Sequence, residues 1–135
     1  MRNERIESLA GNGAAPDQTE KLVGAGRGKL QARTAREIER RQIRYGILGR
    51  DFADGPSWSM LLALLEAQLN GRNTSIKDLY LAGNCPKTSA IRLVGKLESA
   101  GLVRREPDKN DKRRCFLLLT PKANALLMAY FDSIG

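Results

Sequence analysis

Two short helix patterns, separated by only a few turn-forming residues, constrain this chain more than any other feature. Ser75 and Asp78 fit a capping box, in which a hydroxyl and a carboxylate three residues later bind free amide groups at a helix start. This first helix is expected to break at Gly83 and Asn84, because both residues tolerate left-handed backbone angles. Pro86 then suits the first turn of a second helix. Two helices joined by a turn of about three residues form a helix-turn-helix.

Two short strands and another helix are expected directly after the second helix. That helix is expected to end near Ser99, and residues 102–106 and 115–119 have the composition of strands on either side of a polar turn. A hairpin in this position makes a helix-turn-helix winged. Thr120 and Pro121 then combine an N-cap with a first-turn proline, which predicts a final amphipathic helix.

The residues before the motif are expected to form two further segments and the start of the winged domain. Residues 1–30 are rich in glycine and lack a sustained apolar period, so we expect a flexible leader. Residues 31–54 are rich in arginine and are expected to form a basic amphipathic helix. The winged domain is expected over residues 55–135. The predicted fold class is therefore mainly α with a small β-hairpin, a winged helix-turn-helix plus an N-terminal basic helix.

The charge balance of the chain favours a polyanionic partner. Lysine and arginine number 23 against 15 acidic residues, which gives a net charge of +8. Nucleic acid is the first candidate and an anionic membrane surface the second, although many small proteins are basic only for solubility. No apolar run approaches the roughly 20 residues of a membrane span, and no signal-like stretch follows Met1. We therefore expect a cytoplasmic protein that does not enter a membrane.

The scarcity of reactive side chains argues against an enzyme. The chain has no histidine, and its two cysteines are Cys85 and Cys115. Common zinc sites, a Ser/His/Asp triad and a Cys/His dyad therefore cannot be built. We expect no catalytic residues, no metal site and no cofactor.

The second helix of the motif separates its side chains into two faces. At about 100° per residue, Ala90, Leu93, Val94 and Leu97 gather on one side, with Ile91 at the margin. The opposite face is cationic and rich in hydroxyl groups, which suits base edges in the major groove, but a solvated helix face has the same composition. The candidate DNA-binding residues at its N-terminal end and beyond are Lys87, Thr88, Ser89 and Arg92, with Lys96 better suited to phosphate.

A cluster of cations lies in and beside the expected hairpin. A cationic ribbon fits phosphate contact, and a tip arginine, for which Arg113 is the candidate, fits a narrow minor groove. The alternative is intramolecular neutralisation by the interleaved Glu106, Asp108 and Asp111, of which Asp111 is expected to brace the hairpin. The candidate DNA-binding residues here are Arg104, Arg105, Lys109, Lys112, Arg113 and Arg114.

Residues spread over the motif, the hairpin and the start of the final helix form a pattern that is specific in its combination. They are Leu79, Ser89, Arg92, Leu97, Glu98, Gly101, Leu102, Val103 and Arg105, then Asp111-Lys112-Arg113-Arg114 and Leu119-Thr120. With this pattern, the segment from about Trp58 to Ile134 resembles the MarR family of bacterial regulators. The resemblance implies a homodimer on a roughly palindromic operator, with the second helix of the motif in the major groove and a wing arginine in the minor groove. A small-molecule effector is compatible with the family but has no support in this sequence.

The chain also departs from the family pattern. Its final helix is shorter than the long dimerising C-terminus of the family, so the dimer contact is expected from the basic N-terminal helix instead. Ile38, Tyr45 and Phe52 recur seven residues apart and are expected to pair with the final helix of a second copy. Cys85 at a helix start is open to two interpretations, a redox switch or a buried or capping thiol, whereas Cys115 is expected to point inward from its strand.

The predicted function is sequence-specific binding of double-stranded DNA by a transcription regulator. The alternative is a winged-helix protein-interaction module, in which the apolar final helix docks another chain and the positive charge is incidental.

Overall fold

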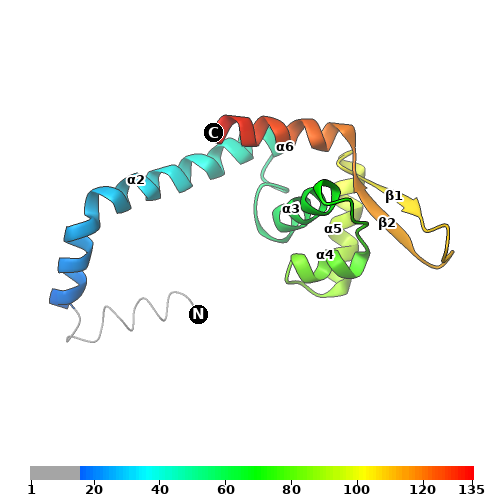
Figure 1. Cartoon of the computed structure of the whole chain (residues 1–135), viewed down its shortest axis with the longest axis horizontal. Coiled ribbons are helices and arrows are strands. Elements are labelled where there is room, and N and C mark those ends of the chain that lie inside the picture. The colour runs from blue at the N-terminus through cyan, green and yellow to red at the C-terminus, as the bar shows by residue number, and fades with distance from the viewer. Residues whose placement is uncertain (1–15) are drawn as a thin grey trace. The chain divides into compact units, whose positions relative to one another are not determined.

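The computed structural model of the chain describes residues 16–135 and has the winged helix-turn-helix fold (Figure 1). Two compact units meet between Glu39 and Arg40, and each is described by itself. In the second unit, Figure 1 shows the two strands extending away from the helices of the motif. The elements are α2 (Pro16–Leu48), α3 (Gly55–Leu69), α4 (Ile76–Ala82), α5 (Lys87–Ser99), β1 (Val103–Pro107), β2 (Cys115–Leu119) and α6 (Pro121–Ile134).

The N-terminal helix starts earlier than the sequence predicted. α2 already begins at Pro16, so the part of the expected leader that follows residue 15 is helical, and residues 1–15 lie outside the described residues. Gly24, Gly26 and Gly28 suggested a leader because each glycine costs a helix about 1 kcal/mol relative to alanine. The alanine, leucine, lysine, arginine and glutamine residues of this segment are strong helix formers and outweigh that cost.

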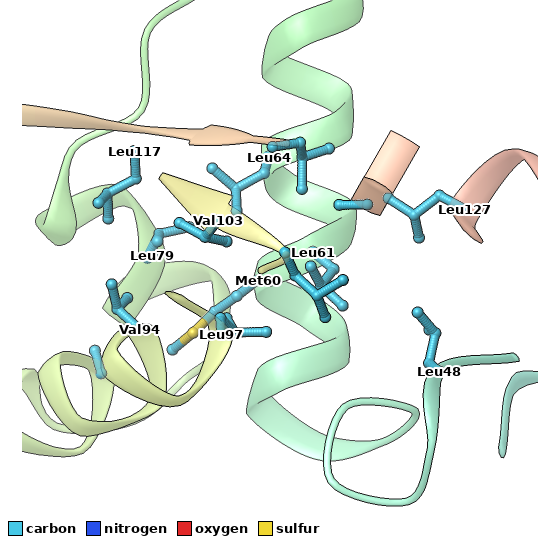
Figure 2. Packing of buried hydrophobic residues seen from close by; sticks show 14 of the residues in the cluster. Leu48, Met60, Leu61, Leu64, Leu79, Val94, Leu97, Val103, Leu117 and Leu127 are labelled. Atoms are coloured by element: carbon cyan, nitrogen blue, oxygen red, sulfur yellow. The ribbon is translucent and has the colours of Figure 1, made fainter. Parts of the chain in front are cut away.

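The helix α3 lies at the centre of the core, as its apolar composition predicted. Met60, Leu61 and Leu64 are buried on it. Figure 2 shows side chains of α4, α5 and the strands on one side of α3, and Leu48 and Leu127 on the other. The winged domain is therefore organised around α3, with the helix-turn-helix and the hairpin packed against the same helix.

The turn between α4 and α5 is set by a close approach to α3. The predicted capping box is present, since the Ser75 hydroxyl accepts from the Asp78 amide at 3.2 Å and the Asp78 carboxylate accepts from the Ser75 amide at 2.9 Å. Asn84 is left-handed, with φ of 49°. Gly83 is right-handed, contrary to expectation, but a Cβ atom at this position would lie 3.0 Å from the Met60 methyl carbon. Glycine is needed here for space and not for its backbone angle.

Backbone hydrogen bonds and a helix cap connect the hairpin to the rest of the domain. β1 and β2 pair antiparallel, with Val103 opposite Leu119, and the Leu117 amide also donates to the Thr74 carbonyl at 2.8 Å. Thr120 caps α6, because its hydroxyl oxygen accepts from the Ala123 amide at 3.1 Å. The wing therefore leaves the core at a defined position.

Arg44, near the end of α2 in the second unit, connects three parts of that unit. Its side chain is only 15% exposed, and it donates to the Ala53 carbonyl and to the Tyr130 hydroxyl, both at 2.9 Å. The guanidinium also lies 4.9 Å from the centroid of the Trp58 ring. The Asp54 carboxylate accepts from the Tyr45 hydroxyl and from Arg44, and the Tyr45 hydrogen bond is the main cause of the lowered pKa of Asp54.

These contacts involve two residues of the expected dimer face. Tyr45 and Phe52 pack against the core of their own chain, so the seven-residue spacing marks an intramolecular face at these two positions. Ile38 is exposed. Tyr45 and Phe52 are half-buried and already have partners in their own chain, and the pairing of all three residues with a second copy stays a prediction.

Replacing Arg44 by alanine is expected to lower the free energy of unfolding by about 2–3 kcal/mol, because it removes three hydrogen bonds of a half-buried side chain and leaves the Ala53 carbonyl without that donor. Chemical denaturation would measure the change. Arg36→Ala, at an exposed position of the same helix, is the matched control and is expected to stay within about 0.5 kcal/mol of the wild type. Equal losses in the two variants would contradict the connecting role of Arg44.

Candidate nucleic-acid interface

The helix α5 is the second helix of the helix-turn-helix and is called the recognition helix from here on, which is the conventional name for this position in the motif. It presents the predicted polar face to solvent. Ala90, Val94 and Leu97 are fully buried against the core. Of the five candidates on this helix, four have exposed side chains, and Ser89 is half-buried because it lies at the edge of the buried face. The exposed candidates are Lys87, Thr88, Arg92 and Lys96.

Gly95 leaves a gap in the side-chain cover of the same face. A Cβ atom built at Gly95 would have no neighbour within 4 Å, so packing in the free protein does not require glycine there. Glycine is unfavourable in a helix interior. Its presence instead allows another molecule to approach the backbone beside Arg92 and Lys96.

The loop between β1 and β2 is held together by a carboxylate that is almost completely buried. Asp108 is 5% exposed and accepts hydrogen bonds from Arg114 Nε and Nη2 at 3.0 and 2.9 Å. It also accepts from the Asn110 amide at 2.9 Å. This backbone hydrogen bond, followed by the bonds from Arg114, holds the pKa of Asp108 below its ordinary value. The two strands β1 and β2, with residues 108–114 between them, are called the wing. Asp108 is the central residue that holds its loop together.

Asp111 contributes to the same loop, as predicted, but less deeply. Its carboxylate accepts from the Arg113 amide at 3.0 Å, and its carbonyl accepts from the Arg114 amide at 3.0 Å. The Arg113 side chain lies 3.7 Å from this carboxylate and remains 95% exposed. The tip arginine is thus directed to solvent from a braced turn.

A second ion pair joins the wing to the recognition helix. Arg105 Nε and Nη2 both lie 2.9 Å from Glu98 Oε1, and the hydrogen bond with Glu98 is the main cause of the raised pKa of Arg105. Arg104 Nη1 lies 3.7 Å from Glu106 Oε2, which forms a further ion pair within β1. The structure therefore brings the wing and recognition-helix candidates into one domain, but it gives Arg105 and Arg114 structural partners of their own.

Two of these partners were assigned no bracing role by the sequence analysis. Asp108 follows Pro107 in a turn and binds an amide two residues on, which is a common signal for aspartate in turns. Glu98 had no local signal, because it lies seven residues before its partner Arg105 and on a different element.

A cavity of about 470 Å³ lies between the start of α4, the recognition helix and the wing. Cys115 is half-buried on the face of β2 that also carries the buried Leu117 and Leu119, as expected for an inward-pointing residue. It lines this cavity, with its sulfur 4.0 Å from Arg105 Nη1. Cys85 packs against the core, which favours the buried-thiol interpretation over a redox switch. The residues that line the cavity include Ile76, Ile91, Arg105, Arg114, Cys115 and Leu117.

Comparison with known proteins agrees with this geometry. The family model for a winged helix DNA-binding domain matches residues 61–123. The structure of NadR in complex with 4-hydroxyphenylacetate is 30% identical, with a TM-score of 0.57, and the match covers 79% of this chain and 70% of NadR. No curated protein matches the chain.

Two further solved structures share the fold. The transcriptional regulator Tm0710 from Thermotoga maritima is 25% identical, with a TM-score of 0.56, over 78% of this chain and 73% of that protein. A mutant of MepR from S. aureus, bound to an oligodeoxyribonucleotide, is 22% identical, with a TM-score of 0.61, over 77% of this chain and 73% of MepR.

The chain belongs to the MarR family of winged helix-turn-helix regulators. It is a DNA-binding transcription regulator, and the relatives that show this are regulators and not enzymes. None of the helices in residues 16–135 is long and apolar enough to cross a membrane.

Gly95→Ala is expected to change stability and DNA binding in opposite directions. Alanine should stabilise the fold by about 0.5–1 kcal/mol, because the site is helical and has free space. The added methyl group should weaken DNA binding by about tenfold, roughly 1.4 kcal/mol, if the backbone at Gly95 comes close to the groove floor. Thermal unfolding and fluorescence anisotropy with labelled duplexes would measure the two effects.

Gly46→Ala is the matched control, since Gly46 is also helical and a Cβ atom there has open space. It should give a similar gain in stability without a change in DNA affinity. Unchanged affinity in Gly95→Ala would show that DNA does not approach this part of the recognition helix.

Proposed function

We propose that the chain binds double-stranded DNA in a sequence-specific manner as a homodimer. The observation that carries this proposal is the exposed Thr88 and Arg92 side chains on a helix that the Glu98–Arg105 ion pair joins to an arginine-tipped wing. Side chains near the N-terminus of a recognition helix contact base edges in this class of domain.

The candidate residues divide into three roles under this proposal. Lys87, Thr88, Ser89 and Arg92 contact base edges, with Arg92 suited to donate to guanine. Lys96, Arg104, Lys109 and Lys112 neutralise phosphates, and Arg113 enters the minor groove. Arg105 and Arg114 contribute charge from positions that their carboxylate partners fix.

Selection of bound duplexes from a random library tests this proposal. We expect one preferred motif with two-fold symmetry, because a homodimer presents two copies of the same recognition helix. A selection that recovers no preferred sequence would contradict specific recognition.

Two arginine variants are expected to affect the binding of the selected duplex differently. Arg92→Ala should cost about 1–3 kcal/mol and relax the preference at one position of each half-site, because a base contact is lost. Arg113→Ala should weaken binding most for duplexes with A/T tracts at the flanks, where a narrow groove concentrates negative potential.

Arg50→Ala provides the matched control for both variants, because Arg50 is an exposed cation in the loop after α2. Its guanidinium carbon lies 5.8 Å from the centroid of the Tyr45 ring. It should leave the selected motif and the affinity unchanged. If Arg92→Ala, Arg113→Ala and Arg50→Ala all showed the same small loss of DNA affinity, the result would indicate only a general effect of removing positive charge.

The homodimer requires apolar side chains that each unit, taken by itself, leaves exposed. Met128 on α6 is 65% exposed, and Leu30 and Ile38 on α2 are exposed beside a shallow groove of the first unit. We assign these residues to the dimer. The alternative function, a protein-interaction module, uses the same exposed residues of α6 for a different chain.

Ile38→Glu and Met128→Glu are each expected to shift the protein from dimer to monomer, because a charge would be buried in the contact. Analytical ultracentrifugation at micromolar concentration would measure the shift. Leu69→Glu, at an exposed leucine that ends α3, is the control and should remain dimeric. A wild-type monomer would contradict the homodimer, and a wild-type monomer without DNA affinity would favour the interaction module.

A further inference from the structure

The recognition helix carries one exposed side chain that its polar face does not explain. Ile91 is 48% exposed, whereas Ala90, Val94 and Leu97 on the same helix are fully buried. Isoleucine is also a weaker helix former than alanine, lysine or arginine, because its branched side chain loses freedom next to the preceding turn. Neither burial nor helix propensity therefore accounts fully for an isoleucine at this position.

The surroundings of Ile91 place it on the side of the recognition helix that faces the wing. It lines the cavity together with Ile76 and Leu117, and arginines of the wing line the same cavity. It lies directly before Arg92 and three residues after Thr88, so it belongs to the N-terminal half of the helix. An apolar group thus lies among cations, next to the residues assigned to base contact.

This combination fits one group in the major groove. Among the four natural bases, thymine alone presents a methyl group there, and apolar side chains discriminate it by contact. The cations beside Ile91 suit the phosphates on either side of such a base pair. A single exposed apolar residue elsewhere on a protein needs no explanation, but at this position a base edge is the partner that a helix in the major groove would offer.

We propose that Ile91 is a specificity-determining residue that recognises the C5-methyl group of a thymine in each half-site. The inference rests on the proposed function, because it needs the recognition helix in the major groove. The contact lies between the bases contacted by Thr88 and Arg92 and the segment of DNA reached by the wing.

The test replaces each thymine of the selected duplex, one at a time, by deoxyuridine, which lacks only the methyl group. The wild-type protein should lose about fourfold in affinity at one thymine of each half-site, the factor expected for one buried methyl-sized group. Ile91→Ala should bind the thymine duplex more weakly by a similar factor and should lose nothing further at that position.

Leu69→Ala is the matched control, since Leu69 is an exposed leucine at the end of another helix. It should retain the fourfold effect of the missing methyl group. Thermal unfolding of both variants should show that each remains folded, and Ile91→Val, which keeps a branched side chain, should retain most of the methyl effect.

The outcomes separate this inference from the proposed function. A preferred motif whose thymines all tolerate deoxyuridine, or an Ile91→Ala variant with the same methyl dependence as the wild type, would overturn the role of Ile91 alone. A selection that recovers no preferred motif would overturn both.

Discussion

The approach of α4 to α3 at Gly83 is the contact on which the position of the recognition helix depends. Because a Cβ atom at this position would be 3.0 Å from the Met60 methyl carbon, a larger residue would require Met60 or the end of α4 to shift. The left-handed Asn84 follows at once and redirects the chain into the recognition helix. The orientation of the exposed face of that helix therefore follows from close packing between two other helices.

The wing packs into the core through Val103, Leu117 and Leu119, and polar contacts also fix its position in the domain. Glu98 and Arg105 link it to the recognition helix, and the Thr74–Leu117 backbone hydrogen bond links it to the residues before α4. Exposed ion pairs contribute little to stability, so these links set position more than they add free energy. A rigid spacing between helix and wing allows one domain to contact two adjacent grooves of a duplex.

The parts that could be predicted from sequence are those determined by near neighbours in the chain. The capping box of α4, the turn at Asn84, the two faces of the recognition helix and the Thr120 cap each involve residues a few positions apart. The failures concern partners that are distant in sequence. The spacing of Tyr45 and Phe52 showed an apolar face but not what covers it, and nothing near Glu98 indicated its bond to Arg105.

In the wing loop, the residues that hold the backbone in place are different from the residues that are exposed at the tip. Asp108 and Arg114 hold the loop from within, mainly through each other and through backbone amides, while the Arg113 side chain extends into solvent. Replacement of Arg113 or its neighbouring lysines therefore leaves the scaffold of the loop intact. Single substitutions at the tip can therefore persist in descendants of this protein without compensating mutations in the fold.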